Sequence, residues 1–229
     1  YSTMILKIKY NERIMNIINS RLKTKVDMIE LVVEISKFLL IKSKLGACTS
    51  GSLYIDSESR RIFISQPNPK TGESRHFSFQ FPFRVDNSKF DTEQIILSTY
   101  SQDLIIQSSH LQVLKSLMNE SIFTQNRNRY GLHFDLSVLI EEKLKELDLP
   151  IFFLGEINDL LLDLLLFEPS YIRFDHHSDK ANGKTHPLYH FDVFYSQQTT
   201  FKVGFDSLLP YSKFRTMMDR TEKECLFLK

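Results

Sequence analysis

The 229-residue chain contains no tryptophan, only two cysteines and no long apolar run. Cys48 and Cys225 stand far apart and in no metal-ligand spacing, so we expect no disulfide framework and a reducing cytoplasm as the compartment. The longest apolar run, residues 160–167, is interrupted by Asp163 and is too short to span a bilayer. The first residues also lack the basic-then-apolar pattern of a signal peptide. The sequence therefore predicts a cytoplasmic protein without a membrane-spanning segment.

An excess of charge of one sign is also missing. Lys and Arg number 29 against 28 Asp and Glu, so no overall field attracts nucleic acid or an anionic membrane, although a local basic patch is compatible with this balance. The chain contains no phosphate-binding Gly-x-x-x-x-Gly-Lys, no dinucleotide fingerprint and no nucleophile elbow. We therefore do not expect this chain alone to hydrolyse ATP.

The residues that are present indicate a globular protein with a phenylalanine-rich core. Apolar residues make up 42% of the chain, with 19 Phe and nine Tyr, and the length suffices for one sizeable domain or two small ones. Apolar residues recur at intervals of three and four over 5–22, as at Ile14, Ile18 and Leu22, and again over 26–45. These two segments predict N-terminal helices, which end at the breaker-rich stretch 46–52.

The pattern then changes to the period of two that is typical of strands. Residues 53–65 predict two short strands around a polar turn, and 75–85 predict one strand with alternate Phe side chains on one face. Pro82 lies within that strand and favours a position at the edge of a sheet.

The second half groups its helices and strands. Residues 91–122 are mostly helical in pattern, with 103–107 equally compatible with a strand, and 124–131 form a polar loop. Helices are predicted from Asp135 or Ser137 to 147 and over 155–167, the latter apolar on nearly every side and hence buried. Strands at 170–175, 188–195 and 199–205 precede a last helix from Tyr211. The sequence therefore predicts an α+β fold: an N-terminal helical segment over 1–45, then an α+β domain over 46–229 whose mostly antiparallel sheet ends in a polar-faced three-stranded meander. The two parts form separate domains or a single one.

The stretch 171–195 concentrates four of the chain's seven histidines between apolar positions. Side chains alternate across strands, so pairing Asp175 with His190 also places Arg173 opposite Asp192 on one face. Lys202 joins this face if the apolar residues that alternate with it on the third strand, Phe201, Val203 and Phe205, point to the core. The loop between the first two strands adds further polar groups beside this face: His176, His177, Asp179 and His186.

This polar face has three interpretations. A divalent ion (manganese, magnesium or zinc) can bind through Asp175, His177, His186 and His190 and activate water for hydrolysis. Without metal, His190 held by Asp175 can act as a general base while Arg173 or Lys202 stabilises a phosphate. The third interpretation is structural: the same residues form cross-strand pairs worth up to about 1 kcal/mol each. The spacing departs from the restriction-endonuclease-like pattern, which has an acid where Thr200 stands.

A second polar constellation lies in 127–133. Arg127 and His133 have the Arg-x5-His spacing, which resembles HEPN-type ribonucleases, and that resemblance implies activation of a ribose hydroxyl. Gly131 interrupts the helix that this family requires at the motif. The alternative is a surface loop that contacts phosphate or an acidic partner.

The last sixty residues carry a wider resemblance. The string Ile172-Arg173-Phe174-Asp175, then His186-Pro187, His190, a strand and an aromatic-containing helix after Pro210, resembles the end of a bacterial family catalogued as domain of unknown function 2290. The resemblance implies a component of prokaryotic anti-phage defence that occurs beside a helicase. It also implies that Arg173, Asp175, His186 and His190 are the first positions to test.

Two functional hypotheses follow. In the first, favoured by the neutral charge and the absence of a complete motif, the chain is an accessory subunit whose segment 75–85 and N-terminal helices dock a larger helicase or NTPase, with nucleic acid bound through that complex. In the second, the chain is the effector, a nuclease or phosphodiesterase that uses the polar face of 173–202. Convergence of Arg173, Asp175, His190 and Asp192 would support the second hypothesis, whereas a row on an open sheet would be structural.

Overall fold

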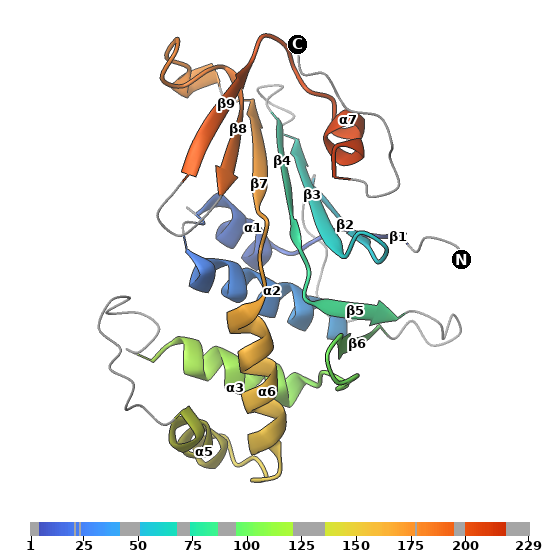
Figure 1. The fold of residues 1–229 in the computed structure, drawn as a ribbon, viewed down its shortest axis with the longest axis vertical. Helices are drawn as coiled ribbons and strands as arrows, with labels where there is room; N and C mark the ends of the chain where they lie inside the picture. Colours follow the sequence, from blue (N-terminus) through green and yellow to red (C-terminus); the bar gives the residue numbers. More distant parts are fainter. Residues whose placement is uncertain are drawn as a thin grey trace. The chain divides into compact units, whose positions relative to one another are not determined.

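The computed structural model describes residues 5–20, 22, 24–41, 51–67, 74–86, 95–120, 136–176, 178–194 and 200–218. Its helices and its antiparallel seven-stranded sheet confirm the predicted α+β class (Figure 1). The chain divides into two compact units: a sheet unit of Tyr1–Glu12, Gly46–Phe81 and Glu168–Lys229, and a helical unit of Arg13–Leu45 and Pro82–Phe167. The chain thus leaves the helical unit after Leu45 and returns to it at Pro82.

Seven strands form the sheet unit's main layer, and every neighbouring pair is antiparallel. In chain order they are β1 (Ile5–Ile8), β2 (Ser52–Asp56), β3 (Arg61–Pro67), β4 (Ser74–Gln80), β7 (Ile172–His176), β8 (Tyr189–Phe194) and β9 (Thr200–Phe205). Their spatial order is β1-β2-β3-β4-β7-β8-β9. The C-terminal meander β7–β8–β9 therefore extends the sheet of the earlier strands, and its three strands match those predicted.

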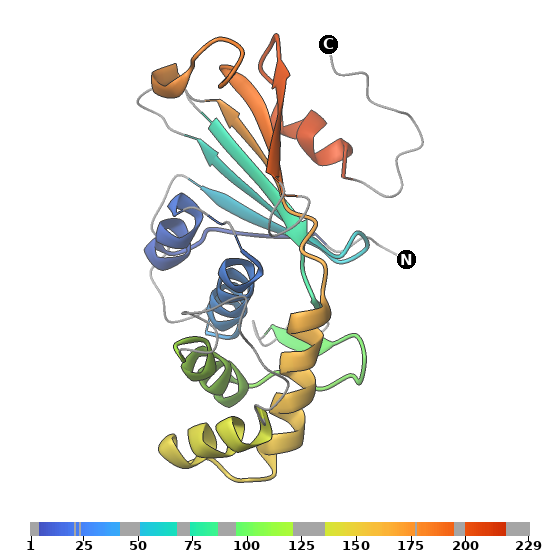
Figure 2. The same ribbon diagram turned by 60° about the vertical axis from the view of Figure 1, so that its left-hand side comes forward.

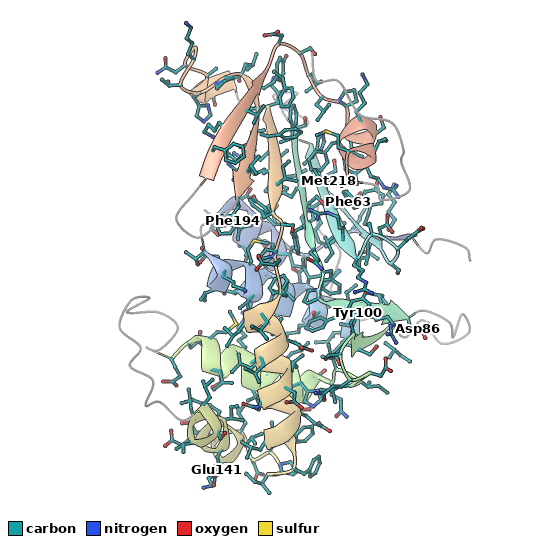
Figure 3. The ribbon with its side chains drawn as sticks, viewed as in Figure 1. Phe63, Asp86, Tyr100, Glu141, Phe194 and Met218 are labelled. Carbon is teal, nitrogen blue, oxygen red and sulfur yellow. The ribbon has the colours of Figure 1, made fainter. Side chains whose placement is uncertain are left out.

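One face of this sheet packs against α7 (Tyr211–Thr216), as Figure 2 shows. The buried cluster there consists of Phe63, Phe174, Phe191, Leu209 and Phe214. In Figure 3 Phe63 and Met218 lie side by side in this layer, and Met218 packs against the cluster. His76 also belongs to it, because its ring lies 5.9 Å from that of Phe174 and 5.8 Å from that of Phe214.

The opposite face changes character across the sheet. On β2, β3 and β4 it carries buried apolar side chains: Leu53, Ile55, Ile62, Ile64, Phe77 and Phe79. Phe77 pairs with Arg173, so on β7, β8 and β9 the same face carries the polar residues of the meander. The polar face is thus continuous with an apolar core and is not an isolated hairpin surface.

The helical unit contains a helix assembly and a second, two-stranded sheet. Its elements are α1 (Glu12–Asn19), α2 (Lys25–Leu40), α3 (Ser108–Met118), α5 (Leu136–Glu146), α6 (Phe153–Leu166), β5 (Phe83–Asp86) and β6 (Ile96–Thr99). A capping box between Thr24 and Asp27 begins α2. The carboxylate of Glu34, buried in α2, accepts from Arg13 at 3.0 Å and from Lys115 at 2.9 Å, which ties α1, α2 and α3 together. Burial raises the pKa of Glu34.

The predicted helix over 5–22 is wrong in its first part. Residues Ile5–Ile8 form β1, which pairs with β2, and the helix α1 begins only at Glu12. Apolar and basic residues alternate from Leu6 to Tyr10, so a period of two precedes the helical period. The face that carries Ile14 and Ile18 is buried as predicted.

The prediction of one edge strand over 75–85 is also wrong. Strand β4 ends at Gln80 and lies between β3 and β7, and β5 starts at Phe83 in the other sheet, paired with β6. Pro82 separates the two strands, because a residue without an N–H group cannot continue a ladder. Phe77 to Phe83 are almost completely buried at every second position, so the docking surface expected there is part of the core.

The remaining predictions of elements were correct in part. Residues 91–122 contain β6 as well as α3, and 103–107 form only a single bridge, from Ile105 to Ser98. Helix α6 is present, but Leu162 and Leu166 on it are exposed. Arg127, His133, Cys48 and Cys225 lie outside the described residues. Among the described residues, the helices fall short of the length and apolar character that a membrane span requires.

Candidate metal site

The predicted register of the meander is confirmed. Asp175 pairs with His190, Arg173 with Asp192, and Asp192 in turn with Lys202. Alternation along the strands therefore brings all five side chains to one face, as expected. Phe201 and Val203 were predicted to point to the core, but they are 47% and 37% exposed because β9 is an edge strand.

His190 is held by the loop that precedes its strand. Its Nδ1 lies 2.8 Å from the carbonyl oxygen of Pro187, and its side chain is fully buried. The Pro187 ring lies on β9 at Gly204, where a Cβ would come within 2.8 Å of Pro187 Cγ. The ring of His186 covers His190 edge-on at 4.5 Å. A carbonyl only accepts, so Nδ1 donates the proton and the neutral ring keeps its lone pair on Nε2.

The Nε2 atom of His190 points towards two carboxylates. It lies 3.7 Å from Oδ2 of Asp175 and 4.0 Å from Oδ1 of Asp192, and no described residue forms a hydrogen bond with it. Burial, followed by the charge of Lys202, lowers the pKa of His190 and so favours the neutral ring. One ligand atom from each of Asp175, His190 and Asp192 falls within 4.8 Å of the others, so these residues can hold a metal ion.

Within the part of the chain that the structure describes, three cations contact the two carboxylates. Nη2 of Arg173 lies 2.8 Å from Oδ2 of Asp175 and also bonds Oδ2 of Asp192. Lys202 donates to Oδ1 of Asp192, and Nε of Arg75 lies 3.5 Å from Oδ1 of Asp175. Burial alone would raise the pKa of Asp192, but the hydrogen bond from Lys202 and the charge of Arg173 hold it below its ordinary value. Asp192 is therefore ionised, and the contacts with the three cations fix both carboxylates in place.

Arg75 is the member of this cluster that the sequence did not reveal. It pairs with Asp175 because β4 and β7 are neighbours, although about one hundred residues separate them in the chain. The alternation of polar and apolar residues over 75–85 indicates a strand, but one sequence does not reveal that this strand pairs with another so far away in the chain.

The structure does not bring all of the predicted ligands together. His186 packs on the ring of His190 and lies outside the three-residue group, and its expected place as a ligand is taken by Asp192. His176 contacts Tyr189, and Asp179 is exposed in the turn η1 (Ser178–Lys180). His177, like Arg127 and His133, lies outside the described residues.

The geometry also bears on the metal-free interpretation. The 3.7 Å between Asp175 and His190 exceeds a hydrogen bond, and the fully buried Nε2 faces carboxylates and not solvent. This arrangement suits a metal ligand better than a general base.

Comparisons with protein-family models, curated proteins and solved structures found no match.

Proposed function

We propose that this protein hydrolyses phosphodiester bonds in nucleic acid, with a divalent ion bound by Asp175, His190 and Asp192. The observation that carries the proposal is the buried Nε2 of His190, which has no hydrogen-bond partner among the described residues and lies near the carboxylates of Asp175 and Asp192. A mixed imidazole and carboxylate set favours manganese or zinc over magnesium.

The structural alternative explains this nitrogen less well. A set of cross-strand pairs would place a donor on Nε2, because a buried polar atom without a partner costs about 1–3 kcal/mol. The described residues instead place a lone pair opposite two negative groups. A cation at this point would satisfy all three residues at once.

The residues around the ligands suit phosphodiester chemistry. In hydrolysis the water oxygen bonds to phosphorus, the bond to the leaving oxygen breaks, and the proton of the water passes through solvent to that oxygen. A bound divalent ion would supply Lewis acidity and lower the pKa of the water. Arg173 and Lys202, both partly exposed beside the carboxylates, would stabilise the negative charge that develops on the phosphoryl oxygens.

The test is a nuclease assay of the full chain on single- and double-stranded DNA and RNA, with manganese, zinc, magnesium or a chelator. We expect metal-dependent cleavage that is lost in His190→Ala and Asp175→Ala, with thermal unfolding within a few degrees of wild type. Asp179→Asn, which changes an exposed carboxylate of the same hairpin, is the matched control and should retain activity. Cleavage that persists in both ligand variants would refute the proposal.

A second candidate is an accessory subunit of an anti-phage complex with a helicase or NTPase, as the family resemblance implies. It is favoured by exposed apolar residues on the edge strand β9 and in the segment after it, Phe201, Val203 and Leu208. An exposed edge with such side chains suits strand addition by a partner. Gel filtration of the chain mixed with a helicase of the kind that the resemblance implies as partner should show one complex for wild type and separate peaks for Phe201→Glu. Co-elution that is identical for both would contradict this role of β9.

A further inference from the structure

The oxygen that the metal needs on Asp192 is already held by a side chain of the same sheet. Oδ1 of Asp192 is the carboxylate oxygen that lies 4.0 Å from Nε2 of His190, and it is also the oxygen to which Lys202 donates. The ammonium of Lys202 therefore occupies a contact that the proposed metal would make. Oδ2 of Asp175, the other carboxylate oxygen near Nε2 of His190, is likewise held by a cation, Arg173.

The charges of the cluster also oppose a metal that binds alone. Arg75, Arg173 and Lys202 contribute three positive charges against two negative charges from Asp175 and Asp192, which leaves one positive charge. His190 binds metal as the neutral ring and adds none. A divalent ion would raise the sum to three positive charges in a partly buried site, where such repulsion is poorly screened.

Of the three cations that the structure describes in this cluster, Lys202 has the most exposed side chain. It stands on the edge strand β9 with a side chain 34% exposed, whereas Arg173 is 22% exposed and bridges both carboxylates. A lysine ammonium is a point charge on a flexible stem, and it binds phosphate as readily as carboxylate. An anion beside the metal would both offset the added charge and accept Lys202.

We propose that Lys202 couples the two ligands of this site: the metal displaces its ammonium from Asp192, and the released ammonium binds the phosphodiester of the substrate. Metal and phosphodiester then bind cooperatively, each increasing the affinity for the other by the same factor. This inference rests on the proposed function and assigns Lys202 as its substrate-binding residue. It also makes the protein without substrate a weak binder of metal.

The test is calorimetric titration of manganese into the full chain, with and without dimethyl phosphate as the diester probe, at equal ionic strength. Wild type should bind manganese about tenfold more tightly with the probe, within the range typical of coupled sites. Lys202→Met should bind manganese more tightly than wild type without the probe and should lose the enhancement. Lys213→Met, a change of an exposed lysine on α7, is the matched control and should behave as wild type.

The outcomes separate the two proposals. Manganese affinity that is equal with and without the probe in wild type, or an enhancement that survives in Lys202→Met, would overturn the coupling and leave the metal site intact. Absence of manganese binding under both conditions would overturn the proposed function itself. Circular dichroism of both variants would establish that they fold like wild type.

Discussion

His76 and His190 are both buried histidines of one sheet, but they lie on opposite faces in opposite surroundings. His76 is enclosed by aromatic rings from β7 and α7, and its Nδ1 lies 3.3 Å from the hydroxyl of Ser65. His190 has Nδ1 fixed by a backbone carbonyl and Nε2 directed at two carboxylates without a described hydrogen-bond partner. Burial is common to both, so burial alone does not identify a site. The groups that face the remaining nitrogen distinguish the candidate ligand from the core residue.

Replacing each histidine with phenylalanine tests whether the surroundings of the ring, and not its burial, identify the metal ligand. His190→Phe should reduce metal-dependent cleavage by roughly 1000-fold or more, because it removes a ligand of a group that acts as a unit. His76→Phe keeps an aromatic ring in an aromatic cluster and should leave kcat within a few-fold of wild type. Cleavage rates of the two variants at saturating manganese check this. An equal loss of cleavage rate in both variants would mean that general destabilisation, and not loss of a metal ligand, lowers the activity.

The pH dependence of stability should single out His76. Burial lowers the pKa of His76 from 6.5 to about 4, so the unfolded chain takes up the proton first. Its stabilising contribution is complete above about pH 6.5 and is lost as the pH falls towards 4. Between about pH 7 and pH 5 wild type should lose roughly 2 kcal/mol more than His76→Phe. Urea unfolding at the two pH values measures this difference, and parallel losses would show that His76 is not the group responsible.

A smaller effect is expected at Gly204, which shapes the environment of His190 without touching the ligands. In Gly204→Ala the new Cβ meets the Pro187 ring and displaces the carbonyl that fixes the tautomer of His190. Manganese affinity should fall about tenfold, the lower end for a residue that orients a ligand. Gly155→Ala is the control, since a Cβ there has open space and should instead stabilise α6 by up to about 1 kcal/mol. An unchanged manganese affinity in Gly204→Ala would show that the position of Pro187 does not control metal binding by His190.

The smallest effect concerns the outer edge of the meander. Phe201→Thr changes an exposed side chain on β9 and should alter the free energy of unfolding by less than about 0.5 kcal/mol. Chemical denaturation measures this. A loss above about 1 kcal/mol would show that Phe201 is packed after all, as the alternation of β9 first suggested.

The register of the meander was predictable because it depends on residues that are close together in the chain. Alternation over 171–205 is enough to place Asp175 opposite His190 and Arg173 opposite Asp192, and both pairings are confirmed. The neighbour of β7 was not predictable, since β4 comes from a distant part of the chain and brings Arg75 to the site. The pattern at 75–85 was misread for a related reason: it continues across Pro82 although the two strands belong to different sheets.

The tautomer of His190 also lay beyond the sequence. It depends on the hydrogen bond to Pro187 and on the absence of a side chain at Gly204, two features of the folded loop. The sequence therefore indicated His190 as a candidate without showing which nitrogen is available. It also favoured His186 as a ligand over Asp192, because proximity in the chain does not reveal the direction of a ring.

The most direct test of the metal site is a crystal structure of the full chain grown with zinc and dimethyl phosphate, with anomalous data collected at the zinc edge. We expect an anomalous peak at about 2.0–2.2 Å from Nε2 of His190 and from one oxygen each of Asp175 and Asp192. We also expect Lys202 to bond the phosphate in place of Asp192. Lys202 still bonded to Asp192, with no peak between the three residues, would contradict the account and make the cluster a set of structural ion pairs.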